Sequence, residues 1–165
     1  LPIYVNTHPE EMKNPERLLA SLQCAQNRDL SLVIEIHEQA VTDIAEMQSL
    51  AANIKSMGMD LAYDDFGAGQ ARLLELTEAT PEVVKFDIAL IRNIHKTGTH
   101  KQQLLELLVS MVKKMGIRAL AEGVSLKEEA EVCERLGFDL MQGFSFGYPL
   151  PLDEWKHHFL EPDRK

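Results

Sequence analysis

The chain alternates between two patterns of hydrophobic and polar positions. Short apolar runs bounded by polar or turn-forming residues are typical of buried strands. Six such runs occur, at Ile3–Val5, Leu32–Ile36, Leu61–Tyr63, Val83–Phe86, Ala119–Ala121 and Phe138–Met141. Longer stretches carry apolar residues at helical spacing, at Pro15–Gln26, Val41–Met57, Gln102–Met115, Lys127–Leu136 and Asp153–Leu160. Glycines follow three of these stretches as stop signals, and Ser125 is placed to cap the helix that begins at Lys127.

Strict alternation of strands and helices predicts an α/β protein with a largely parallel sheet. Two architectures fit this pattern. An open doubly wound sheet needs only about five or six strands. A closed barrel needs eight strands and typically about 250 residues. The length of 165 residues alone favours the open sheet, and we expect one domain over residues 1–165.

Every predicted strand contains or ends in a polar residue that a purely structural strand would not select. These residues are Asn6, Glu35, Asp64, Asp65, Lys85, Asp87, Glu122 and Gln142. Carboxylates are rarely buried unless they are paired or bind a metal. Because parallel strands bring their carboxyl ends to one face, we expect these side chains to lie together there.

This set of residues has a chemical interpretation. Oxygen ligands without His or Cys suit hard cations such as Mg²⁺ or Mn²⁺. Adjacent Asp64 and Asp65 could hold two ions that polarise a phosphodiester and activate water, and Lys85 could neutralise charge in the transition state. Gly67 and Gly69 would let the following backbone turn tightly beside a ligand.

Composition narrows the range of functions. The net charge of −9 weighs against binding of a nucleic-acid polymer. No apolar run is long enough to contact or span a membrane, and no signal peptide is visible, so we expect a cytoplasmic protein. Cys24 and Cys133 are expected to be buried, reduced thiols. We expect His37 to face the side opposite Glu35 and to have a structural role.

Six segments together resemble the EAL domain family. They are YVN at 4–6, EIHE at 35–38, DDFGAG at 64–69, KFD at 85–87, AEGV at 121–124 and QGFSFGYP at 142–149. The resemblance covers nearly the whole chain and implies a TIM-like β/α barrel. About six strand–helix units would be present, corresponding to the C-terminal two-thirds to three-quarters of the family domain.

The resemblance also implies residue roles in a hydrolysis of cyclic di-GMP to pGpG, in bacterial second-messenger signalling, with two Mg²⁺ or Mn²⁺ ions. Asn6 and Glu35 would bind one cation, Asp64 would bridge both, and Asp65 and Glu122 would bind the second. Three further residues would act on the substrate or the water, or support those that do: Lys85, Asp87 and Gln142. Glu38 would brace the loop after the paired aspartates, near the interface of a homodimer.

The chain departs from the family pattern in three places. The Glu-Ala-Leu triplet that names the family does not precede Leu1, so we expect the chain to be part of a longer protein and inactive by itself. Ser125 stands where the family usually has Glu, and the loop continues as DDFGAGQARL. Two functions therefore remain open: a phosphodiesterase, or a catalytically silent receptor that binds cyclic di-GMP or a partner protein.

Overall fold

The structure is a computed structural model, and it describes residues 2–8, 11, 15–26, 30–37, 43–69, 73–151 and 154. Six parallel strands form one sheet in the order β1-β2-β3-β4-β5-β6. Their bounds are β1 Ile3–Asn6, β2 Leu32–His37, β3 Asp60–Phe66, β4 Val83–Phe86, β5 Arg118–Ala121 and β6 Leu140–Met141. Each strand therefore pairs with its neighbour in sequence, as a β/α barrel requires.

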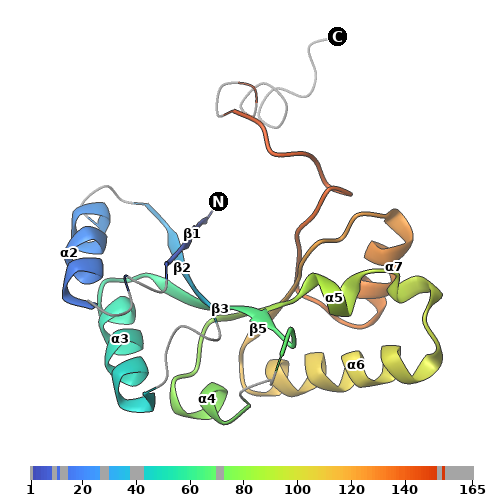
Figure 1. The fold of residues 1–165 in the computed structure, drawn as a ribbon, viewed down its shortest axis with the longest axis horizontal. Coiled ribbons are helices and arrows are strands. Elements are labelled where there is room, and N and C mark those ends of the chain that lie inside the picture. Colours follow the sequence, from blue (N-terminus) through green and yellow to red (C-terminus); the bar gives the residue numbers. More distant parts are fainter. Residues whose placement is uncertain are drawn as a thin grey trace.

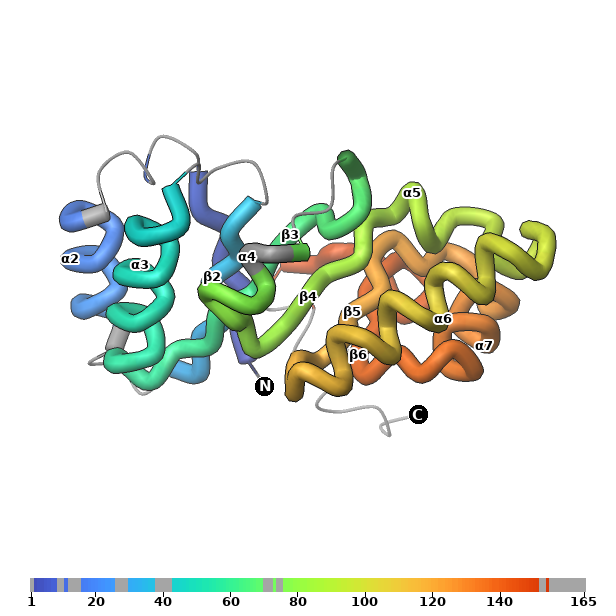
Figure 2. The backbone as a smooth tube through the Cα atoms, turned by 90° about the horizontal axis from the view of Figure 1, so that it is seen from below, coloured from blue at the N-terminus to red at the C-terminus, as the bar shows by residue number. Residues whose placement is uncertain are grey.

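Helices connect the strands and lie around the outside of the curved sheet (Figures 1 and 2). Their bounds are α2 Pro15–Gln26, α3 Ile44–Ser56, α4 Leu73–Glu78, α5 Ile88–Ile91, the 3-10 helix η1 Ile94–Lys96, α6 Thr99–Lys114 and α7 Lys127–Arg135. The predicted α/β class and the incomplete barrel are confirmed. In the described part of the chain, no helix combines the length and the apolar character needed to cross a bilayer.

The two faces of the sheet bury different apolar layers, because successive side chains of a strand point to opposite faces. The outer face packs against the helices, with Ile34, Ile36 and Phe86 at its centre. The inner face carries a smaller cluster, formed by Val33, Ala62, Val83 and Leu120 with Tyr4 and Leu140 packed against it. The polar residues at the carboxyl ends of the strands lie next to this inner apolar layer.

Ion pairs and side-chain caps stabilise the amino-terminal ends of the strands. Arg118 Nη2 lies 2.7 Å from Asp60 Oδ2, which links β5 to β3. Asp139 accepts a hydrogen bond from the backbone N–H of Ala119 at 2.9 Å, and Lys113 Nζ pairs with the same carboxylate at 2.7 Å. Charged groups at this end of the barrel thus serve stability.

Several local predictions were wrong. β6 begins at Leu140, because Phe138 turns into the core against Phe86 and Asp139 caps the neighbouring strand. Cys24 is exposed, whereas Cys133 is buried and burial raises its pKa to about 11. The short helices α4, α5 and η1 were not predicted, because one or two turns are too short to show a helical period. The predicted helix at residues 153–160 lies outside the described residues, except for position 154.

Candidate functional site

A layer of polar side chains lies directly above the inner apolar layer. In each strand the polar residue follows the inner apolar residue by two positions, so both point to the same face. The pairs are Tyr4 and Asn6, Val33 and Glu35, Ala62 and Asp64, Val83 and Lys85, Leu120 and Glu122, and Leu140 and Gln142. All six polar residues lie at the carboxyl ends of the strands, as predicted.

Lys85 lies at the centre of this layer. Its ammonium group is 2.8 Å from Glu35 Oε1, 2.8 Å from Asp64 Oδ1 and 2.8 Å from Glu122 Oε1. The side chains of Lys85 and Glu35 are almost fully buried, with exposed fractions of 4% and 3%. One buried cation thus joins carboxylates from three other strand ends.

Burial and pairing act in opposite directions on these groups. Burial lowers the pKa of Lys85, but hydrogen bonds to Asp64, Glu122 and Glu35 outweigh it and raise that pKa above its ordinary value. Burial raises the pKa of Glu122 to about 7, although Lys85 opposes the shift. Three carboxylates surround one ammonium, so negative charge is in excess and an additional cation would be stabilised in the site.

A β-bulge brings Asp64 and Asp65 to the same side. Neighbouring strand residues normally face opposite sides, but the register with β4 shifts between Tyr63 and Phe66. Asp65 has a left-handed backbone with φ of 59°, uncommon for a residue with a side chain. Carboxylate oxygens of Asp64, Asp65 and Glu122 consequently lie within 4.8 Å of one another.

Asp65 has two further neighbours. Burial and the charge of Asp64 raise the pKa of Asp65, and Asp87 adds to this shift while His37 opposes it. Asp87 begins α5, since its Oδ1 accepts the backbone N–H of Ala89 at 2.7 Å. Asp87 therefore lies beside Asp65 at the N-terminus of α5.

The predicted orientation of His37 was wrong. Residues two apart in a strand share a face, so His37 lies on the same side as Glu35. Its Nε2 is 2.7 Å from Asp65 Oδ2. The two-residue period of side-chain direction in a strand predicts this orientation of His37 from the sequence alone.

Gly67 allows the turn that follows the paired aspartates. Its φ of 89° is one that side-chain-bearing residues rarely adopt, and a Cβ there would lie 2.6 Å from Leu90 Cδ1. Gly69 is exposed beside the undescribed residues 70–72. Asn6 and Gln142 are exposed at the two outer strands, and Glu38 lies outside the described residues. The structure thus brings together Glu35, Asp64, Asp65, Lys85 and Glu122.

A buried carboxylate holds the loop that carries Glu122. Glu129 of α7 is only 2% exposed. Its Oε1 accepts the N–H of Asn93 at 2.7 Å, and its Oε2 accepts those of Ser125 at 3.0 Å and Leu126 at 3.2 Å. These hydrogen bonds lower the pKa of Glu129 although burial opposes them. Leu126, rather than the predicted Ser125, is the N-cap position, because the Glu129 carboxylate reaches back to the helix start.

Replacing Glu129 with alanine should lower the free energy of unfolding by about 1–3 kcal/mol, because three backbone donors lose their acceptor. Urea unfolding followed by circular dichroism measures this change. Glu128→Ala on the exposed side of the same helix is the matched control and should change stability by less than about 0.5 kcal/mol. Equal stability of the two variants would contradict the role of Glu129.

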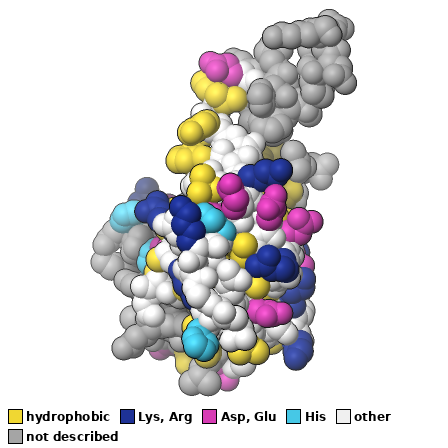
Figure 3. Space-filling model, turned by 90° about the vertical axis from the view of Figure 1, so that its right-hand side faces the viewer, with side chains coloured by type: hydrophobic (Ala, Val, Ile, Leu, Met, Phe, Trp, Pro, Cys, Tyr) yellow, Lys and Arg dark blue, Asp and Glu magenta, His cyan; other side chains and the backbone are white. Residues whose placement is uncertain are grey.

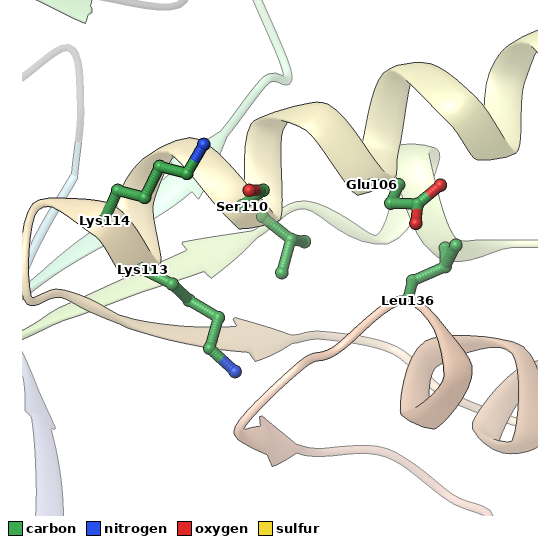
Figure 4. A pocket seen from close by; sticks show the side chains of 6 residues that line it. Glu106, Ser110, Lys113, Lys114 and Leu136 are labelled. Atoms are coloured by element: carbon green, nitrogen blue, oxygen red, sulfur yellow. The ribbon is translucent and has the colours of Figure 1, made fainter.

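A groove of about 370 Å³ lies elsewhere, between α6 and the C-terminal end of α7 (Figure 4). It is lined by Glu106, Val109, Ser110, Lys113, Lys114 and Leu136. Lys114 and Leu136 lie just before β5 and β6, at the end of the sheet opposite to the polar layer. The groove therefore does not belong to the site.

The surface near α6 and α7 mixes basic and acidic side chains, and hydrophobic side chains cover the extension beyond β6 (Figure 3). In that extension Phe144 and Tyr148 stack with ring centroids 4.8 Å apart. Both are exposed. The segment after Gln142 thus presents aromatic faces rather than a continuation of the core.

The donor set of the site fits a hard divalent cation. Asp64, Asp65 and Glu122 offer only oxygen atoms, which Mg²⁺ and Mn²⁺ favour. A ligand carboxylate must be deprotonated, so a cation would bind more readily above the raised pKa of Glu122 than below it.

Comparison with known proteins gives the family. The EAL domain model matches residues 1–149. Two relatives from Escherichia coli (strain K12) are the probable cyclic di-GMP phosphodiesterase PdeN, 31% identical over 94% of this chain, and the blue light- and temperature-regulated antirepressor BluF, 30% identical over 70% of it. The chain spans 29% of the length of PdeN and 28% of that of BluF.

A solved structure agrees with the sequence match. The manganese and cyclic di-GMP complex of Klebsiella pneumoniae BlrP1 is 32% identical, with a TM-score of 0.73 over 86% of this chain and 37% of that one. The family model covers all six strands that carry the polar layer. The chain therefore belongs to the EAL domain family.

Proposed function

We propose that the protein containing this chain is a cyclic di-GMP phosphodiesterase. One water molecule would be added across one phosphodiester bond of the cyclic dinucleotide, which yields linear pGpG. The observation that carries the proposal is the buried Lys85 ammonium, 2.8 Å from each of three carboxylates. The names of PdeN and of the BlrP1 complex support the choice of cyclic di-GMP.

The proposed roles of the metal-binding residues follow the family resemblance, and the proximity of carboxylate oxygens of Asp64, Asp65 and Glu122, within 4.8 Å of one another, supports a shared cation. Asn6 and Glu35 would hold one Mg²⁺ or Mn²⁺ ion, Asp64 would contact both ions, and Asp65 and Glu122 would hold the other. When bound, the two cations would supply Lewis-acid polarisation of the phosphodiester and lower the pKa of the attacking water.

Lys85 would act mainly on the transition state. It stays protonated at physiological pH, because its pKa lies above the ordinary value. Its fixed positive charge lies among the groups that would surround the phosphate, where negative charge grows during hydrolysis. Asp87 would hold the turn beside Asp65. Gln142 would contact the substrate from the end of β6, the strand that pairs with β5.

The resemblance also supports a homodimer. Glu38 would then link the loop after Asp65 to the interface between the two copies.

A receptor without turnover is the second candidate. BluF is named as an antirepressor, so membership of the family extends to proteins with a regulatory name. Ser125, where the family usually has Glu, also favours this alternative. Its hydroxyl donates to the carbonyl of Gly123 at 3.0 Å, so here the position fastens the loop that carries Glu122.

Hydrolysis by the full-length protein distinguishes the two candidates. Purified protein is incubated with cyclic di-GMP and Mn²⁺, and pGpG is quantified by chromatography beside a calorimetric affinity measurement. We expect pGpG to form with Mn²⁺ and not in chelator-treated protein. Binding without turnover would support the receptor, and neither binding nor turnover would contradict both candidates.

A further inference from the structure

His37 contacts the site but has no role in the function proposed so far. It ends β2, and its backbone pairs in register with Asp64 of β3. Its Nε2 lies 2.7 Å from Asp65 Oδ2, with exposed fractions of 40% for His37 and 33% for Asp65. The pair therefore lies at the rim of the polar layer.

The side chain of Asp65 depends on a hydrogen-bond partner for its orientation more than the neighbouring side chains do. Its left-handed backbone places it at the end of the bulge, where the strand no longer dictates the direction of the side chain. Asp64 is instead held by Lys85 at 2.8 Å. His37 thus contacts Oδ2 of Asp65, whose carboxylate also belongs to the acidic cluster.

Stability alone does not account for this contact. A partly exposed charged or hydrogen-bonded pair of side chains contributes only about 0–1 kcal/mol to stability. The ion pair between Arg118 and Asp60 serves the opposite end of the sheet. The His37–Asp65 pair instead involves one of the three carboxylates whose oxygens lie within 4.8 Å of one another.

We propose that His37 is a positioning residue that orients the carboxylate of Asp65 and thereby sets the affinity of the site for its second divalent cation. This inference rests on the proposed function. Residues that orient a metal ligand through a hydrogen bond typically change metal affinity by about 10–100-fold when they are removed.

The test compares two substitutions at position 37 in the full-length protein. His37→Leu removes the hydrogen-bond donor, whereas His37→Gln keeps an N–H at a similar reach. Calorimetric titration with Mn²⁺, without substrate, should show about 10–100-fold weaker binding of one ion for His37→Leu. His37→Gln should bind Mn²⁺ nearly as well as the wild type.

A kinetic measurement separates positioning from a general loss of structure. For His37→Leu the Mn²⁺ concentration at half-maximal hydrolysis should rise, while turnover at saturating Mn²⁺ stays within a few-fold of the wild type. His100→Leu, in which an exposed histidine of α6 is replaced, is the matched control for metal binding by a surface imidazole. It should change neither value.

Three results would overturn the inference. Equal Mn²⁺ affinity of His37→Leu and the wild type would show that Asp65 needs no such support, and wild-type hydrolysis would still uphold the proposed function. Equally weak binding by His37→Gln and His37→Leu would show that a hydrogen-bond donor alone is not what matters. Absence of both Mn²⁺ binding and hydrolysis in the wild type would contradict the proposed function as well.

Discussion

Replacing Lys85 with alanine in the full-length protein should lower the rate of cyclic di-GMP hydrolysis by about 10²–10³-fold, the usual cost of removing one preorganised electrostatic group. The affinity for cyclic di-GMP should stay close to that of the wild type, because the charge of Lys85 matters mainly in the transition state. Chromatographic detection of pGpG with saturating Mn²⁺ gives the rate, and calorimetry gives the affinity.

A matched lysine controls for loss of charge. Lys113 also pairs with a carboxylate, Asp139 at 2.7 Å, but at the opposite end of the strands. Lys113→Ala should keep nearly full turnover. Three carboxylates lose a buried partner in Lys85→Ala, which could destabilise the fold. Thermal unfolding with Mn²⁺ present therefore checks that this variant is folded. Full activity of folded Lys85→Ala would contradict its role in the reaction.

Replacing Asp64 with asparagine should weaken Mn²⁺ or Mg²⁺ binding more than any other single change in the acidic cluster. Asp64 is proposed to contact both cations, and the substitution removes its charge and exchanges one oxygen ligand for an amide nitrogen. The loss should exceed the roughly 10–100-fold effect of residues that only orient ligands. Calorimetric titration of the metal measures it.

Asp139→Asn provides the comparison for this change. Asp139 is also a paired carboxylate, but it caps Ala119 far from the polar layer. Metal affinity should therefore be unchanged in Asp139→Asn. Equal metal affinity of Asp64→Asn and the wild type would rule out the bridging role.

Much of the site could be predicted because it follows the period of the strands. Glu35, Lys85 and Glu122 each lie two residues beyond a buried apolar residue on the same face, so the period of the strand predicts the direction of their side chains. Parallel strands then bring these residues to one end of the sheet. The barrel architecture was predicted only through the family resemblance, since length alone favoured an open doubly wound sheet.

The features that could not be predicted depend on backbone detail or on long-range contacts. A regular strand would place Asp65 on the face opposite Asp64, and only the bulge brings them together. Glu129 also accepts the backbone N–H of Asn93, which lies 36 residues earlier in the chain, and no local pattern predicts this contact. The orientation of the His37 side chain, by contrast, follows from the strand period, and the prediction for it was wrong.

The order of the strands also bears on how the molecule folds. Each strand pairs with the next one in sequence, so every pairing closes a loop of only one strand–helix unit. Short loops have a low entropic cost of closure, and sheets built from such neighbours can grow one unit at a time. Glu122, however, follows β5, whereas Lys85 lies in β4. Lys85 therefore gains the third of its carboxylate partners only when β5 docks beside β4.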